Sequence, residues 1–133
     1  MTENNDAPGG GAPAEDARTG EGPADGAAAG GPRDGLFVRF WGVRGSIACP
    51  GPRFARYGGN TSCIEVRVGG RLVVFDAGSG LKPLGDALVA EAPLDADLFL
   101  SHTPVDHIQG LPYFATNFDK RSRFRVCPAR LHR

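Results

Sequence analysis

The sequence predicts a mixed α/β domain over residues 35–133, preceded by a disordered tail over residues 1–34. Three observations support this prediction. The tail is dominated by Gly, Ala, Pro and acidic residues and has almost no large apolar residues, so it cannot form a core. From Leu36 onward, short apolar runs and alternating segments are typical of strands. Between two of these strands, leucines recur at three- and four-residue steps, which is the spacing of an amphipathic helix.

Strands are expected where apolar residues alternate with polar ones, or form short runs between turn residues. The expected strands lie at residues 36–41, 62–68, 71–75, 97–100 and 124–127. Gly69-Gly70 separates the second strand from the third and supplies the positive φ angles of a two-residue hairpin turn. In the second strand, the side chains of Cys63, Glu65 and Arg67 should face away from those of the apolar residues between them.

One helix is expected between the hairpin and the fourth strand. It follows a tight turn at residues 76–80, whose glycines and serine lack the lysine and the spacing of a phosphate-binding loop. The apolar face of this helix comprises Leu81, Leu84, Leu88 and Val89. The helix should end before Pro93. Strand, helix and strand in this order predict a sheet covered by helices.

Two further segments are less regular. Residues 42–52 contain Pro50-Gly51-Pro52 and predict an irregular loop, because proline removes a backbone donor and glycine loosens the chain. Residues 108–118 are ambiguous, with Pro112 near a helix start.

Charge is divided unevenly along the chain. Residues 1–34 contain seven acidic residues and two arginines, and because the whole chain is neutral, the remainder carries a net charge of +5. This division fits an anionic substrate or partner for the folded part, and a tail that merely keeps the protein soluble explains it equally well. No signal peptide and no apolar stretch of about 20 residues is visible, so we expect a cytoplasmic location and no membrane association.

The chain has three cysteines, an odd number at wide spacing. They are Cys49, Cys63 and Cys127, and none forms a CxxC pair. We therefore expect reduced, mostly buried thiols rather than a disulfide framework or a zinc ribbon.

Four motifs, in this order, resemble the start of a metallo-β-lactamase-fold hydrolase. They are WGVRGS (41–46), GGNTSC (58–63), FDAGSG (75–80) and SHTPVDHIQG (101–110). More narrowly, they resemble the branch that includes cyclic-phosphate phosphodiesterases and the tRNA 3′-processing endonuclease. The resemblance covers about residues 36–126 and implies the N-terminal half of a four-layer αββα sandwich.

The resemblance implies a zinc site in the fourth motif, where the family pattern is His-x-His-x-Asp-His. His102, Asp106 and His107 match it as metal ligands, and Asp106 would also be the catalytic residue that steers the nucleophile. Paired zinc ions in the family clamp a phosphoryl group and lower the pKa of a shared water. Pro104 occupies the place of the second histidine and offers no donor atom, so the first metal position would keep only His102 from this motif. Val105 also departs from the family, which usually has an aromatic residue there.

Family members continue into a second half that brings a further His, a metal-bridging Asp and a final His. The corresponding candidate here is His132 in Arg130-Leu131-His132-Arg133, which is expected to be exposed and idle. Without the second half, an apolar sheet face would remain uncovered. We therefore expect a truncated or degenerate copy, or one that needs a partner.

Other residues have two explanations each. Asp76 matches the family aspartate that orients the metal loop by hydrogen bonding, and a helix-capping role fits as well. Trp41 is expected in the core and Asn60 in a turn. A basic segment either attracts a nucleic acid or phosphate ester, or is a solvated strand edge. It comprises Lys120, Arg121, Arg123 and Arg125.

Two hypotheses from different classes follow. The first is a zinc-dependent hydrolase of phosphodiester or related ester bonds, with a small-molecule or nucleotide phosphodiester as substrate. The second is a non-catalytic fragment or a subunit that borrows its missing half, as a homo-oligomer or with a complementing partner. A third explanation, an ordinary loop with surface histidines, is disfavoured because the neighbouring motifs agree with the histidine cluster.

Overall fold

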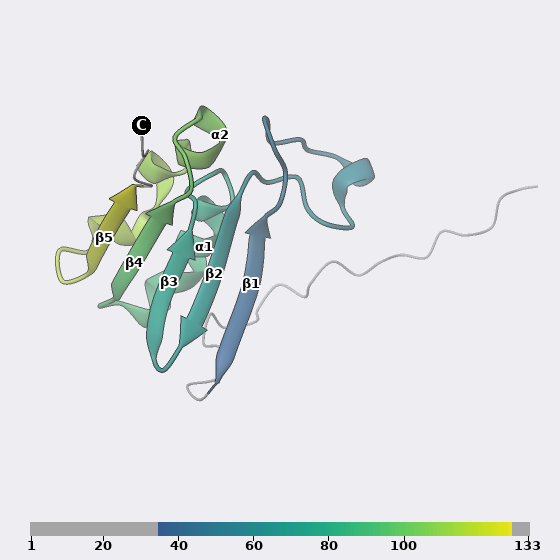
Figure 1. Ribbon diagram of the computed structural model, residues 1–133. Coiled ribbons are helices and arrows are strands. Elements are labelled where there is room, and N and C mark those ends of the chain that lie inside the picture. Colours follow the sequence, from purple (N-terminus) through teal and green to yellow (C-terminus); the bar gives the residue numbers. More distant parts are fainter. Residues whose placement is uncertain (1–34, 129–133) are drawn as a thin grey trace, which may run out of the picture.

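The computed structural model of the protein describes residues 35–128, which form one five-stranded sheet with helices on one face (Figure 1). The predicted tail at 1–34 and the candidate ligand His132 lie outside the described residues. The mixed α/β class is confirmed.

All five predicted strands are present, with ends that differ by one or two residues. They are β1 (Leu36–Gly42), β2 (Cys63–Val68), β3 (Arg71–Phe75), β4 (Asp95–Leu100) and β5 (Arg123–Pro128). They follow each other across the sheet in chain order, with β1, β2 and β3 antiparallel and β3, β4 and β5 parallel. The predicted hairpin turn is confirmed, because Gly69 and Gly70 have φ angles of 53° and 76°.

The predicted helix is α1 (Leu81–Leu88), which connects the parallel strands β3 and β4. Leu81, Leu84 and Leu88 are fully buried against the sheet, as their spacing predicts. The placement of Val89 in this apolar face is wrong, because its side chain is 54% exposed. The chain tightens at that point into the 3-10 helix η2 (Val89–Glu91), where the α-helical period no longer applies.

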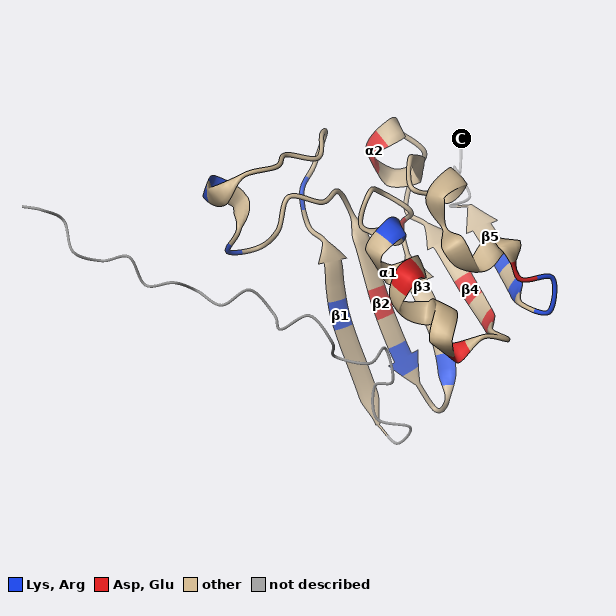
Figure 2. Ribbon diagram, turned by 180° about the vertical axis from the view of Figure 1, so that it is seen from behind, with Lys and Arg blue, Asp and Glu red and all other residues tan. Residues whose placement is uncertain are grey.

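The remaining helical segments are short. They are η1 (Pro52–Phe54), α2 (Val105–Ile108), η3 (Leu111–Tyr113) and η4 (Ala115–Phe118). Pro112 lies in the first turn of η3, as expected, whereas α2 was not predicted. Seen from behind, α1 lies across the sheet, and η2, η3 and η4 contact it (Figure 2). No helix within residues 35–128 is long and apolar enough to cross a bilayer.

The sheet face beneath α1 holds the core. Phe114 closes it between η3 and η4, with its ring edge-on to Phe124 at a centroid distance of 4.8 Å. The alternation predicted for β2 is correct, and its buried side is the one that carries Cys63 and Glu65. Burial raises the pKa of the Cys63 thiol to about 12, with the charges of Glu65 and Asp76 adding to the shift.

Glu65 is fully buried and has partners for both carboxylate oxygens. Trp41 Nε1 donates to Oε2 at 2.8 Å, and Arg67 Nε donates to Oε1 at 2.6 Å. The same guanidinium forms a second, bidentate pair with Glu91, at 2.7 and 3.0 Å. A buried carboxylate is tolerated when it is paired in this way. The network therefore ties β1, β2 and the end of the helical segment together.

The opposite sheet face, toward the viewer in Figure 1, is apolar and uncovered within residues 35–128. Phe40, Ile64, Phe75 and Phe99 lie directly opposite one another in register and form a row across β1 to β4. The exposed large side chains of this face are Leu36, Val38, Phe40, Val68, Phe75 and Phe99. Phe75 and Phe99 stack at a centroid distance of 5.7 Å. An uncovered apolar face is what the sequence predicts.

The three cysteines are free thiols, as predicted. Of these, Cys63 is buried, whereas Cys49 and Cys127 are partly exposed. The expectation of mostly buried thiols is therefore met in full by Cys63 and only in part by Cys49 and Cys127.

Replacement of Glu65 by leucine should lower the free energy of unfolding by about 3 kcal/mol, because it leaves the Trp41 N–H unpaired and removes one partner of a buried ion pair. Glu91→Leu removes the other partner of the same arginine at a more exposed position and should cost about 1 kcal/mol or less. Urea unfolding followed by circular dichroism measures both. Equal losses in the two variants would contradict the prediction.

Candidate functional site

The four motifs meet at the edge of the sheet where β3 and β4 end. Because these strands are parallel, their carboxyl ends lie at the same edge, with Asp76 directly after β3 and Ser101 directly after β4. The polypeptide then turns into α2, which stands above the strand ends and carries Asp106 and His107 (Figure 1). This edge gathers the predicted site residues.

Asp76 is the hydrogen-bond acceptor at the centre of this edge. The Ser101 N–H and Oγ–H both donate to Asp76 Oδ1 at 2.8 Å, and Ser62 Oγ donates to Oδ2 at 3.1 Å. Burial pushes the pKa of Asp76 upward, but the donors of Ser101 and Ser62 and the nearby His107 ring outweigh it and hold the pKa below its usual value. Helix α1 has Gly80 as its N-cap, with no side-chain cap bond. The contacts thus fit the orienting role of Asp76 and not the capping role.

The three predicted ligands, His102, Asp106 and His107, lie close to one another. His107 Nδ1 lies 2.9 Å from Asp76 Oδ2, and His107 Nε2 lies 3.5 Å from Asp106 Oδ2. The first of these is a close electrostatic approach, because the ring is not aligned for a hydrogen bond and Nδ1 is buried without a hydrogen-bond partner among residues 35–128. The ring of His102 lies 4.0 Å from that of His107, centroid to centroid, and its Nδ1 is 2.9 Å from Ser101 Oγ.

These donors do not complete a metal site within the described residues. Imidazole and carboxylate are ligands that zinc prefers, and Asp106 also accepts the Ser46 N–H at 2.8 Å. However, no group of three or more His, Cys, Asp or Glu side chains within residues 35–128 is arranged to hold a metal ion. Pro104 begins α2 and contributes only its carbonyl, which accepts the His107 N–H at 3.0 Å. A full zinc site therefore does not fit the described residues alone.

The loops that carry the motifs are packed backbone to backbone. The Gly78 N–H donates to the Ser62 carbonyl at 2.9 Å, and a Cβ at Gly78 would lie 2.4 Å from the carbonyl oxygen of Asp106. The Gly110 N–H donates to the Ala77 carbonyl at 2.8 Å, and a Cβ there would lie 2.1 Å from the Gly78 carbonyl. Only glycine permits this approach.

A network of short polar side chains fixes the same loops. Thr61 N–H donates to Ser79 Oγ at 2.9 Å, and Ser79 N–H donates to Thr61 Oγ1 at 2.8 Å. Gln109 Nε2 also donates to Thr61 Oγ1, at 3.0 Å, and Ser79 Oγ donates to Asn60 Oδ1 at 3.0 Å. Sequence reasoning missed the roles of Thr61, Ser79 and Gln109, although all three lie inside the quoted motifs.

The basic segment 120–125 is partly neutralised by neighbouring carboxylates. Arg121 pairs with Asp119 at 2.9 Å, and Arg125 pairs with Asp97 at 2.6 Å. Hydrogen bonds from Arg125, and then from Arg71, hold the pKa of Asp97 below its usual value despite partial desolvation. These pairs favour the solvated strand edge over a binding site for a nucleic acid.

No protein-family model and no curated protein matches the sequence. Among solved structures, the chain is similar to a Thermotoga maritima protein provisionally described as a metallo-beta-lactamase, with 18% sequence identity and a TM-score of 0.38. The match covers 61% of this chain and 40% of that protein, so it spans less than half of the other protein's length.

Replacement of Asp76 by asparagine should lower the free energy of unfolding by about 1–3 kcal/mol, because Ser101 and Ser62 lose a charged acceptor. Asparagine tolerates the left-handed φ of 61° at this position, so the backbone should stay in place. A depressed pKa stabilises the native state above the unfolded pKa of about 3.9, and this stability is lost on acidification. The stability of the variant should therefore fall less steeply below about pH 4.

Asp119→Asn is the matched control, because Asp119 also has a pKa held below its usual value, by Arg121, but its side chain is more exposed than that of Asp76. It should leave the unfolding midpoint nearly unchanged. If Asp119→Asn lowered the free energy of unfolding as much as Asp76→Asn, the contribution of Asp76 to stability would not depend on its buried position.

Proposed function

We propose that this chain is a metallo-β-lactamase-fold, metal-dependent hydrolase of phosphodiester or related ester bonds whose metal site is incomplete within residues 35–128. The observation that supports it is the meeting of His102, Asp106 and His107 at the ends of parallel strands. Behind them, Asp76 lies within 2.9 Å of His107. The order of the four motifs adds to this support.

Each residue has a definable role in this proposal. His102 Nδ1 faces Ser101 and His107 Nδ1 faces Asp76, which leaves the Nε2 atom of each ring as the nitrogen available to a zinc ion. The carboxylate of Asp106, held by the Ser46 N–H, would be the catalytic group that orients the attacking oxygen. The further donors that a hydrolytic zinc site needs would come from outside residues 35–128.

A second candidate is a subunit that becomes complete only with a partner. The observation that favours it is the uncovered apolar row on the sheet, in which Phe40 is 63% exposed and Phe75 and Phe99 are 43% and 40% exposed. A contiguous exposed apolar surface of this kind is typical of an interface. The occupant would be a second copy of this chain or a complementing protein that covers the sheet and adds donors.

The hydrolase proposal is tested by zinc binding and turnover of the full chain. Wild-type protein dialysed against buffered zinc should retain less than one ion and cleave bis-nitrophenyl phosphate slowly. Pro104→His restores an imidazole at the family position and should tighten zinc binding by about tenfold or more, since even residues that only support metal ligands are worth 10- to 100-fold. Equilibrium dialysis with metal analysis measures this change.

Val105→His is the matched control, because it adds an imidazole at the neighbouring position, where the side chain is 71% exposed. It should leave the zinc affinity close to that of the wild type. If Pro104→His did not tighten zinc binding, or if both variants tightened it equally, the assignment of position 104 as a ligand position would be wrong. A wild type with neither zinc nor turnover would contradict the hydrolase.

The partner proposal is tested by sedimentation. Wild-type protein should self-associate or aggregate, and Phe75→Glu should shift it toward the monomer, because it places a charge in the centre of the apolar row. Val89→Glu changes an apolar residue outside this row that is at least as exposed as Phe75, and it should leave association unchanged. A wild type that is monomeric and unfolds cooperatively would count against this proposal.

A further inference from the structure

The loop between β1 and β2 is rich in arginine and contains no acidic residue. It spans residues 43–62 and carries Arg44, Arg53 and Arg56. Figure 2 shows these basic positions on the loop that projects from the sheet. Within residues 35–128, none of the three guanidiniums lies within ion-pair distance of a carboxylate. The loop therefore concentrates positive charge that the described residues do not neutralise.

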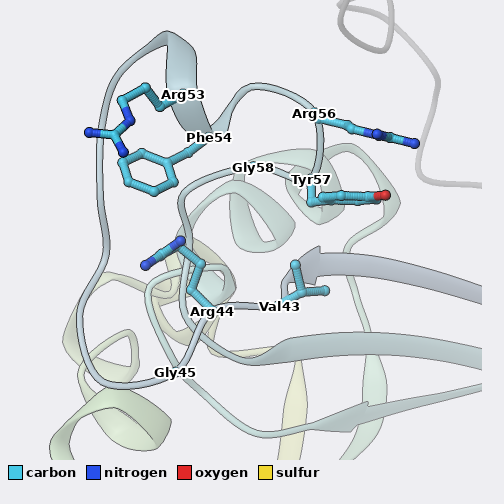
Figure 3. A pocket seen from close by; sticks show the side chains of 8 residues that line it. All are labelled: Val43, Arg44, Gly45, Arg53, Phe54, Arg56, Tyr57 and Gly58. Carbon is cyan, nitrogen blue, oxygen red and sulfur yellow. The ribbon is translucent and has the colours of Figure 1, made fainter.

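The arginines border a cavity of about 530 Å³, lined also by Phe54 and Tyr57. The Arg44 guanidinium lies over the Phe54 ring at 4.4 Å from its centroid. Figure 3 shows the Phe54 ring between Arg53 and Arg44, whereas Arg56 points away along Tyr57. Two guanidiniums that border one cavity can both donate to the oxygens of a phosphate group.

Arg44 carries an unmet hydrogen-bonding capacity in this cavity. Its Nε is buried, and among the described residues it has no hydrogen-bond partner. A buried donor without an acceptor is costly unless a ligand or water satisfies it. The backbone around it is fixed, because the N–H groups of Val43 and Arg44 both donate to the Asn60 carbonyl, at 3.1 and 3.0 Å. The backbone from which the Arg44 side chain extends to the cavity is thus held in place.

A second, mostly apolar cavity of about 640 Å³ adjoins the first and shares Val43, Arg56, Tyr57 and Gly58 with it. Its other walls include Phe40, Trp41 and Pro83. A flat aromatic group fits such a surface by stacking and by removal of apolar area from water. The two cavities together suit a ligand with one anionic end and one aromatic end.

We propose that this loop binds a phosphate ester with an aromatic or heterocyclic substituent, with the phosphate at Arg44 and Arg53 and the ring in the apolar cavity. The loop meets the histidine cluster through Ser46, whose N–H donates to Asp106 Oδ2 at 2.8 Å. As a statement about the substrate, this proposal rests on the proposed hydrolase. As a statement about binding, it can be tested without metal or turnover.

The experiment is a calorimetric titration of the full chain with 4-nitrophenyl phosphate in the presence of a chelator. Saturable binding is expected, and inorganic phosphate should bind about tenfold more weakly because it cannot use the apolar cavity. Arg44→Met and Arg53→Met should each weaken binding of the aryl phosphate by about tenfold, since each removes a charge-assisted hydrogen bond. Raising the salt concentration should also weaken binding of the aryl phosphate to the wild type, because salt screens the charges.

Arg39→Met is the matched control. Arg39 also lies over aromatic rings, at 5.1 Å from Phe37 and 5.4 Å from Trp41, but it does not border either cavity. Its replacement should leave affinity within about twofold of the wild type, because it removes a ring-stacked guanidinium without touching the phosphate position. Arg53 is exposed, so Arg53→Met tests the charge even if Arg44→Met disturbs the loop.

Three results would overturn the proposal: no saturable binding at millimolar ligand, equal affinity of Arg53→Met and wild type, or equal affinity for inorganic and aryl phosphate. Binding without turnover after zinc is added would leave this proposal standing and contradict the hydrolase. A different result would contradict this proposal and leave the hydrolase standing. In that result the aryl phosphate does not bind, and Arg44→Met and Arg53→Met do not change the turnover of bis-nitrophenyl phosphate.

Discussion

The site edge depends on the close approach of three loops at Gly78 and Gly110. A methyl group at either position would come within 2.4 Å of a backbone oxygen, a distance that real Cβ atoms do not reach. Because glycine has no side chain, the loops approach closely enough to place Asp76 under α2. Hydrogen bonds between the backbones hold the loops together in place of side-chain packing. The contact between Asp76 and His107 is a consequence of this packing, because Asp76 follows β3 whereas His107 lies in α2.

The fold could be predicted largely from local patterns, and the two errors, at Val89 and at α2, concern short helical segments. The spacing of leucines identified α1, and the Gly69-Gly70 pair identified the hairpin turn. Val89 was misplaced because the helix tightens into a 3-10 turn, which depends on how the segment leads into β4 and not on the apolar spacing. The four-residue helix α2 is too short to leave a period in the sequence.

Alternation in β2 defined two faces but could not say which one α1 covers. An alternating strand with valine and isoleucine on one side would ordinarily bury that side. Here Glu65 lies beneath the helix, because Trp41 from β1 and Arg67 from β2 satisfy its oxygens. These partners are distant in sequence or on the same strand, and their meeting is a property of the assembled sheet. The apolar side is left facing outward, which gives the uncovered row its length.

In the candidate site, too, some residues could be named from the sequence, whereas other contacts form only in the folded chain. His102, Asp106 and His107 could be named from one contiguous motif, whereas the Ser46 contact and the arginine cavity arise only when the β1–β2 loop folds back. Ser46 adopts a left-handed φ of 68°, which a non-glycine residue keeps only when its surroundings fix it. The acceptor on Asp106 supplies such a constraint. If a phosphate ester binds beside Arg44, the same short loop that holds it also holds the Asp106 carboxylate. The cavity and the histidine cluster would then lie at the two ends of one short segment, and the backbone between Arg44 and Ser46 would connect the bound ester to the carboxylate.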